Sequence, residues 1–329
     1  SAGFCEKERQ KTMFRPRHGA YPTMITPYNR DGTVDYGAVR ALTAWYLEKG
    51  CDGIFASCQS SEIHMLSLED RVKLAAVVKE TAVKLAAESG AEPMTIVASG
   101  HISDSFEDQK KELEEVAATG VDSLILISNR FDIENTSDER WNDDLDRMIP
   151  ALPDIPLGIY ECPRPYKRLL TPAMIDHVTR TGRFAFIKDT CCDRTEIARR
   201  VKQINDTPSP ALKPALFNAN AQTLLDTLRA GAAGYCGVMC NFHPELYVTL
   251  CHTFSEDAGR AERLAALLSQ SAFIEYIDYP SIAKYHLDKV GVRMNDISRT
   301  ARSATDYDRM CVDYMDSLVA MAAEMITKG

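Results

Sequence analysis

Short apolar runs recur along the chain, and a polar turn and an amphipathic stretch separate each run from the next. A brief apolar run bounded by turn residues is typical of a buried β-strand, and the stretch that follows has the periodicity of a helix. Eight runs fit this description: Ala20–Thr26, Gly53–Ser57, Met94–Ser99, Ser123–Ile127, Leu157–Tyr160, Phe184–Lys188, Ala215–Asn218 and Gly234–Val238.

The intervening helices have recognisable ends. Ser67 begins an approximate capping box with Asp70, and Thr171 precedes a proline at the first helical position. Glycines able to adopt the left-handed conformation, such as Gly50 and Gly120, close several of the patterns. The clearest expected helices are Tyr36–Lys49, Leu68–Ala87, Ser105–Thr119 and Gln222–Arg229.

Eight alternating units predict a closed parallel (β/α)8 barrel, of the TIM-barrel class, over residues 18–243. A doubly wound sheet usually has fewer strands, and the chain has no G-x-G-x-x-G or Walker motif. Residues 244–329 show amphipathic helical patterns without a clear strand, and we expect them to form helices packed on the barrel. Residues 1–17 are expected to be a separate N-terminal segment, partly derived from cloning.

Composition narrows the range of partners. The net charge is −9 and the pI is near 5.4, which gives no general basic surface for nucleic acid or an anionic membrane. No run approaches the roughly 18 apolar residues of a spanning helix. Ten cysteines are scattered without a C-x-x-C pair, which favours free thiols in a reducing compartment. We therefore expect a cytoplasmic protein that binds a small molecule.

The carboxyl ends of barrel strands meet at one mouth, so polar residues there are the first candidates for chemistry. Lys188 ends an apolar strand, and burial favours the neutral lysine amine that attacks a carbonyl. A lysine that reaches water or pairs with Asp189 is the alternative. Tyr160 ends the preceding strand, where a phenol can relay protons or serve only as an amphipathic strand end.

The loop Cys58-Gln59-Ser60-Ser61-Glu62 follows the second strand. Hydroxyl groups and free backbone N–H groups in a tight turn suit a carboxylate. Serine-rich turns are common, so this pattern is weak by itself.

Together these segments resemble the dihydrodipicolinate synthase / N-acetylneuraminate lyase family, from about His18 to Arg299. The similarity lies in the order and spacing of several fragments. They are Thr26-Pro27-Tyr28, Gly50-Cys51-Asp52-Gly53-Ile54, Leu66-Ser67-Leu68-Glu69-Asp70-Arg71, Ile159-Tyr160-Glu161-Cys162-Pro163, Ile187-Lys188-Asp189 and Gly231-Ala232-Ala233-Gly234.

The resemblance implies a homodimer or homotetramer that forms a lysine Schiff base with a 2-oxo acid and needs no cofactor or metal. Lys188 would form the Schiff base, and Tyr160 and Ser60 would relay protons. The substrate-binding residues it implies are Gln59, Ser60, Ser61, Arg130, Arg164, Ala219 and Cys236.

The chain also departs from the family pattern. Where the family usually has G-T-T-G-E, this chain has Cys58-Gln59-Ser60-Ser61-Glu62, which lacks both glycines. The tyrosine pair of the synthase branch is replaced by Ser128-Asn129-Arg130-Phe131, and its arginine by Pro165. Arg130 would clamp a second anionic group of the substrate or else form a surface or interface salt bridge.

These observations favour a Schiff-base lyase or aldolase that cleaves or condenses a pyruvate-type substrate. A sugar-acid dehydratase and 4-hydroxy-tetrahydrodipicolinate synthase are alternatives within the family. A metal-dependent enzyme would need clustered ligands, and the seven histidines are dispersed. A non-catalytic binding protein on the same fold is the alternative of another class.

Overall fold

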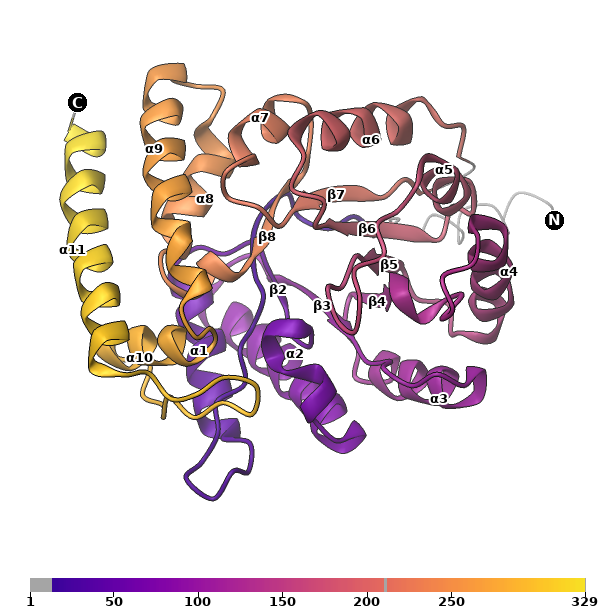
Figure 1. Ribbon diagram of the computed structural model, residues 1–329, viewed down its shortest axis with the longest axis horizontal. Helices are drawn as coiled ribbons and strands as arrows, with labels where there is room; N and C mark the ends of the chain where they lie inside the picture. Colours follow the sequence, from indigo (N-terminus) through magenta and orange to yellow (C-terminus); the bar gives the residue numbers. More distant parts are fainter. Residues whose placement is uncertain (1–13, 210–211, 329) are drawn as a thin grey trace.

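Eight parallel strands form a closed barrel with helices around it (Figure 1). The computed structural model describes residues 14–209 and 212–328, so most of the expected N-terminal segment lies outside the described residues. The strands pair in the order β1-β8-β7-β6-β5-β4-β3-β2, and a parallel bridge from Thr23 to Phe55 joins the two ends. The predicted (β/α)8 barrel is confirmed.

The strands are β1 (Gly19–Pro22), β2 (Gly53–Phe55), β3 (Thr95–Ser99), β4 (Ser123–Ile127), β5 (Leu157–Tyr160), β6 (Phe184–Asp189), β7 (Ala215–Asn218) and β8 (Gly234–Gly237). Three of them, β4, β5 and β7, have the bounds expected from the sequence. The first expected strand extends four residues too far, to Thr26. Pro22 has no N–H with which to continue the ladder, so regular pairing ends there.

The surrounding helices are α1 (Tyr36–Glu48), α2 (Leu68–Ser89), α3 (Phe106–Ala117), α4 (Asp138–Met148), α5 (Pro172–Arg180), α6 (Arg194–Asp206), α7 (Leu224–Arg229) and α8 (Pro244–Thr253). Their ends follow from the expected caps. The Ser67 hydroxyl accepts from the Asp70 N–H at the start of α2, and Thr171 caps α5 in the same way.

Side chains along each strand alternate between the barrel interior and the layer under the helices. In β6, Phe186 points inward and stacks on Phe217 with ring centroids 4.4 Å apart, whereas Ile187 belongs to the outer core. Lys188 lies two residues after Phe186, so it points to the interior side at the carboxyl end of the strand. The strand period thus directs Lys188 to the mouth.

Three further helices, α9 (Ala258–Ser271), α10 (Ser281–Lys289) and α11 (Asp306–Lys328), follow the eighth barrel helix and pack on one side of the barrel (Figure 1). A short 3-10 helix, η6 (Ala272–Tyr276), joins α9 to the segment before α10. The helical extension expected after residue 243 is therefore present, and its first helix, α8, completes the barrel.

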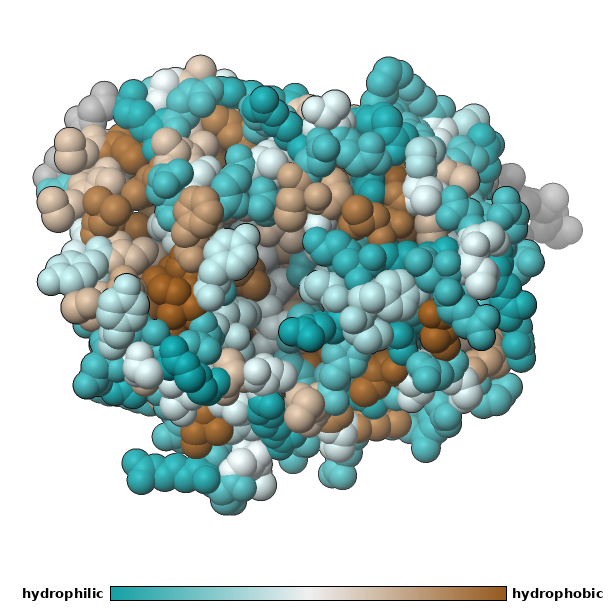
Figure 2. Space-filling view, in the orientation of Figure 1, coloured by the Kyte–Doolittle hydropathy of each residue, from teal (hydrophilic) through white to brown (hydrophobic). Residues whose placement is uncertain are grey.

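Helix α11 exposes a stripe of large apolar side chains. Apolar residues gather on the side of the molecule where Figure 1 places α9 and α11 (Figure 2). The exposed members on α11 are Tyr307, Met310, Tyr314, Leu318, Met321 and Met325. Within residues 14–209 and 212–328, no helix combines the length and apolar character that crossing a membrane requires. The nine cysteines of these residues are all free.

Candidate active site

Lys188 is the buried cation of the barrel mouth. Its side chain is 4% exposed, and its Nζ lies 4.3 Å from the centroid of the Tyr160 ring and 5.5 Å from that of Phe55. Among the described residues it has no hydrogen-bond acceptor and no carboxylate within 4 Å. An ammonium held only by aromatic faces is available to a ligand in the mouth.

Tyr160 is the register partner of Lys188 on the neighbouring strand β5. Its ring meets Phe55 edge-on with centroids 5.4 Å apart, and burial raises the pKa of its phenol well above the usual value. A phenol that stays protonated cannot act as a free base. It can donate its proton and recover it when it is part of a proton relay. Two of the three predicted catalytic side chains are thus brought together.

A buried ion cluster fixes the residues that follow Tyr160 and Lys188. Arg200 on α6 donates to Glu161 at 2.8 Å and to Asp189 at 2.5 Å, and all three side chains are at most 2% exposed. Burial and the nearby Asp189 charge raise the pKa of Glu161 to about 7. Because Asp189 pairs with Arg200, the alternative in which it neutralises Lys188 does not occur in the structure.

The loop after β2 forms one turn of 3-10 helix, η1 (Gln59–Ser61), that faces the mouth. The N–H groups of Gln59 and Ser60 have no protein acceptor within the described chain, and the Ser60 hydroxyl donates to Thr23 at 3.0 Å. The Ser61 hydroxyl instead donates to the Met24 carbonyl at 2.6 Å. Gln59 and Ser60 therefore face the mouth of the barrel, whereas Ser61 ties the loop to the barrel.

The absence of two glycines does not distort this turn. Cys58 has extended backbone (φ −155°, ψ −169°), and Ser61 lies within the 3-10 turn. The left-handed residue is Glu62, with φ 61°. Since neither former glycine position needs a positive φ, side chains are tolerated at both.

Glu62 connects the loop to the C-terminal extension. Its Oε1 accepts from the Ser298 hydroxyl at 2.7 Å and from the backbone N–H groups of Arg299 and Thr300 at 2.6 and 2.9 Å. Its Oε2 lies 3.4 Å from the Nζ of Lys284, which is fully buried. Burial lowers the pKa of Lys284 to about 8. The extension thus holds the turn in place.

A cavity of about 330 Å³ opens at this mouth. Of the predicted site residues, Lys188, Tyr160, Gln59, Ser60 and Ala219 line it. Its lining in full is Gln59, Ser60, Tyr160, Pro163, Lys188, Thr190, Ala219, Gly237, Val238, Glu275, Tyr276, Tyr279, Pro280 and Thr300.

Four predicted substrate-binding residues do not line this cavity: Ser61, Arg130, Arg164 and Cys236. Arg130 is buried and donates to Asp104 at 2.8 Å, beside a different cavity. Arg164 is exposed to solvent. Cys236 is buried in the barrel interior, where burial raises the pKa of its thiol to about 12. In this structure neither arginine lines the cavity that holds Lys188.

The extension contributes lining residues that the sequence analysis did not identify. Glu275 and Tyr276 come from η6, and Tyr279 follows it. The Tyr279 hydroxyl accepts from the Asn241 side-chain amide at 3.1 Å, and the Ser60 and Thr23 side chains oppose the rise in its pKa that burial causes. No local motif marks these residues, because only the return of the chain after α9 places them at the mouth.

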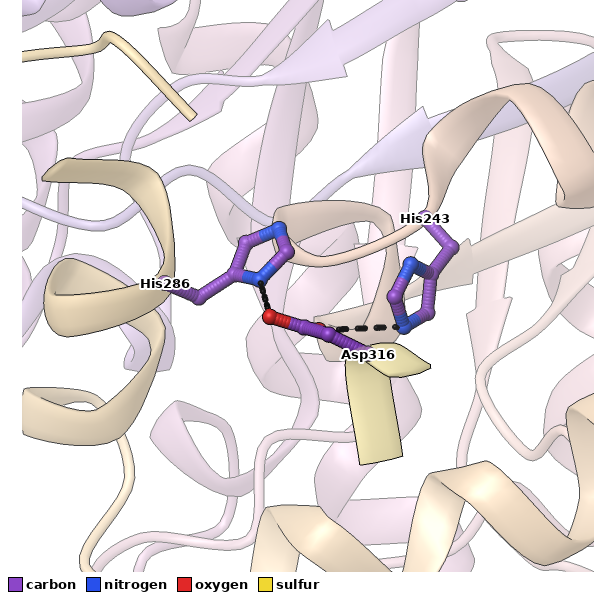
Figure 3. A group of neighbouring side chains, drawn as sticks. All are labelled: His243, His286 and Asp316. Carbon is purple, nitrogen blue, oxygen red and sulfur yellow. Dashed lines mark hydrogen bonds and ion pairs between the residues drawn. The ribbon is translucent and has the colours of Figure 1, made fainter. Parts of the chain in front are cut away.

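One group of side chains in the described chain has spacing suited to a metal ion: His243, His286 and Asp316. Figure 3 shows both imidazoles turned toward the carboxylate of α11. Asp316 accepts from His286 at 3.0 Å and from Lys289 at 3.2 Å, and lies 3.8 Å from His243. None of the three lines the cavity with Lys188. The Asp316 contacts with His286 and Lys289 fasten α11 to α10, and burial lowers the pKa of His243 at the start of α8 to about 3.

Comparison with known proteins places this barrel in a family. Residues 17–303 match the Dihydrodipicolinate synthetase family, and the chain belongs to that family. The chain is 26% identical over 284 residues to the probable 2-dehydro-3-deoxy-D-pentonate aldolase YjhH of Escherichia coli K12, covering 83% of this chain and 87% of that protein. It is 24% identical to 4-hydroxy-tetrahydrodipicolinate synthase of Methanothrix thermoacetophila, covering 84% and 87%.

Solved structures have the same fold. YagE of Escherichia coli K12, in complex with pyruvate, superposes with a TM-score of 0.77 at 17% identity and covers 93% of this chain and 98% of its own. CdNal of Clostridium difficile, in complex with mannosamine, gives 0.78 at 14% identity, covering 91% and 98%. The family resemblance expected from the sequence is confirmed.

Proposed function

We propose that this protein is a Schiff-base-forming lyase of the class I aldolase type, acting on a pyruvate-type 2-oxo acid. The observation that carries the proposal is Lys188, a buried amine without a carboxylate partner that opens on a cavity beside Tyr160. Desolvated lysines of this kind act as nucleophiles toward carbonyl carbon.

In the proposed reaction, the Lys188 amine adds to the C2 carbonyl of the substrate, and loss of water leaves an iminium ion. The bond between C3 and C4 of a 4-hydroxy-2-oxo acid then breaks, and its electron pair forms the enamine as the C4 hydroxyl loses its proton. An aldehyde leaves, and protonation at C3 and hydrolysis release pyruvate and the free amine. Tyr160 moves the protons, and Ser60 joins this relay.

The turn after β2 would hold the C1 carboxylate. Gln59 and Ser60 offer backbone N–H groups without a described protein acceptor, and Ser60 adds a hydroxyl. Tyr279, which lines the same cavity as Ser60 and accepts from Asn241, extends the polar lining beside the turn. Because lysine itself supplies the electron sink, the proposed reaction needs no organic cofactor or metal.

Two other outcomes share the same Schiff base. A dehydratase would eliminate water and keep the carbon count of its substrate. A 4-hydroxy-tetrahydrodipicolinate synthase would condense pyruvate with an amino aldehyde, but the tyrosine pair and arginine of that branch are missing here. The name of the pentonate aldolase relative favours cleavage.

Product analysis tests the proposal. Incubation with a panel of 4-hydroxy-2-oxo acids, with pyruvate measured by lactate dehydrogenase, should show pyruvate and one aldehyde in equal amounts. A product with all the substrate carbons would identify a dehydratase, and binding without turnover would favour a non-catalytic binding protein. A homodimer or homotetramer remains a prediction, which light scattering coupled to size exclusion can check.

A further inference from the structure

Glu275 is a carboxyl group in the cavity of Lys188 that the reaction described above does not use. It lies on η6, in the extension, and lines the cavity together with Lys188 and Tyr160. The side chain is half-buried, and among residues 14–209 and 212–328 it has no hydrogen bond and no ion pair within 4 Å. A partly buried carboxyl without a protein partner costs stability, so its natural partner is a ligand.

The environment of Glu275 supports this view. Burial raises the pKa of its carboxyl to about 7, and the Lys188 charge is what opposes that shift. Other buried carboxylates near the mouth are satisfied: Glu161 and Asp189 pair with Arg200, and Glu62 pairs with Lys284. Glu275 therefore differs from the carboxylates that hold the fold.

The charges that line the cavity restrict the substrate. Apart from tyrosines, Glu275 is the acidic side chain that lines the cavity and Lys188 is the basic one, and the Schiff base consumes Lys188. Arg130 is bound to Asp104, and neither Arg164 nor Lys167, whose amine donates to the Thr190 carbonyl at 2.8 Å, is among the residues that line the cavity. A second carboxylate on the substrate would meet Glu275 without compensation, whereas a hydroxyl would donate to it.

We propose that Glu275 determines specificity by binding hydroxyl groups on the aldehyde half of the substrate, so that the enzyme takes hydroxylated 4-hydroxy-2-oxo acids and rejects dicarboxylic ones. This rests on the proposed Schiff-base lyase function. Tyr276, the neighbour of Glu275 on η6, lines the same wall and has a solvent-exposed ring, so that side of the cavity is open to a tail that extends away from Lys188.

The test compares two substrates in the full-length protein. One is 2-dehydro-3-deoxygluconate, whose tail carries hydroxyls, and the other is 4-hydroxy-2-oxoglutarate, whose tail is a carboxylate. The variant is Glu275→Gln, which keeps the shape and removes the charge. Glu256→Gln is the matched control, because Glu256 is exposed, lies outside the cavity and has no ion pair within 4 Å among the described residues.

We expect the parent to prefer the hydroxylated substrate. Glu275→Gln should lower kcat/KM for it by roughly 10- to 100-fold, the loss expected for a hydrogen bond to a charged group. The rate with the dicarboxylate should not fall, and Glu256→Gln should match the parent. Borohydride trapping of pyruvate should still label the Glu275→Gln variant.

Equal losses on both substrates would overturn the specificity role, as would an unchanged rate on the hydroxylated one. The assignment is also overturned if the parent traps pyruvate yet prefers the dicarboxylate or cleaves neither compound. Failure of the parent to trap pyruvate would instead reject the Schiff-base function itself, so the two failures are distinguishable.

Discussion

The contact between Glu62 and Lys284 gives a sharp prediction about how the extension supports the site. Both side chains are at most 1% exposed, and they join the turn after β2 to α10. Glu62→Gln keeps the shape but removes the negative charge, which leaves the Lys284 ammonium buried without its counter-ion. The Lys284 amine also donates to the Ile297 carbonyl, so it cannot leave for solvent without a further loss.

The loss in free energy of unfolding depends on whether Lys284 keeps its proton once Glu62 is replaced. Removing one partner of a buried pair typically costs about 3–5 kcal/mol. The lysine can escape that penalty by releasing its proton, at about 1.4 kcal/mol for each unit by which its folded pKa of about 8 exceeds the pH. That route costs ~1.4 kcal/mol at pH 7 and nothing at pH 9. We therefore expect Glu62→Gln to lose about 1–2 kcal/mol more at pH 7 than at pH 9.

Urea unfolding of the parent, Glu62→Gln, Lys284→Met and the double variant measures these costs as a cycle. The double variant should recover much of the loss, since methionine fills the lysine stem without a charge. The Glu62→Gln variant should also trap pyruvate more weakly, because Ser298, Arg299 and Thr300 lose part of their acceptor. A loss below about 1 kcal/mol at pH 7, or the same loss at both pH values, would show that Glu62 is not the counter-ion that keeps Lys284 charged.

Three further predictions concern the mouth. Tyr160→Phe should lower kcat by roughly 10²- to 10⁴-fold while the trapped adduct still forms, and comparison of steady-state rates with adduct mass checks this. Arg200→Leu should cost about 3–5 kcal/mol in urea unfolding, because Glu161 and Asp189 are left buried without their cation; an unchanged midpoint would contradict it. Glu275 titrates near 7 instead of its usual 4.5, so the folded state holds its proton more tightly than the unfolded chain. Its contribution to stability is present below pH 4.5 and lost as the pH rises to about 7, so Glu275→Gln should be more stable than the parent at pH 8 and similar at pH 4.5, as thermal unfolding at both values can show.

The sequence predicted the barrel well because each unit repeats a local rule. Continuous apolar runs such as Ser123–Ile127 are buried on both faces, so periodicity and burial agree. The same rule predicted the position of Lys188 and Tyr160 at the mouth, because both lie at the carboxyl ends of adjacent predicted strands. The predicted strand bounds were wrong where the regular hydrogen bonding between strands ends early, as it does after Pro22.

The wall of the cavity could not be predicted in this way. Glu275, Tyr276 and Tyr279 reach the mouth through the packing of α9 and the turn after it, and no motif near them signals a site. Arg130 was a reasonable candidate from its position after β4, but Asp104 draws it to another cavity. Contacts between segments that are distant in the sequence decide which of these residues line the cavity. A local sequence pattern does not show those contacts.

The most direct test of the proposed function is the intact mass of the protein after incubation with pyruvate and sodium borohydride, with Lys188→Ala beside it. The Schiff-base mechanism predicts one reduced pyruvate adduct per chain on the parent, mapped to the peptide that contains Lys188, and none on Lys188→Ala. An adduct on another lysine, or no adduct on a folded parent, would contradict the proposal that Lys188 is the Schiff-base residue.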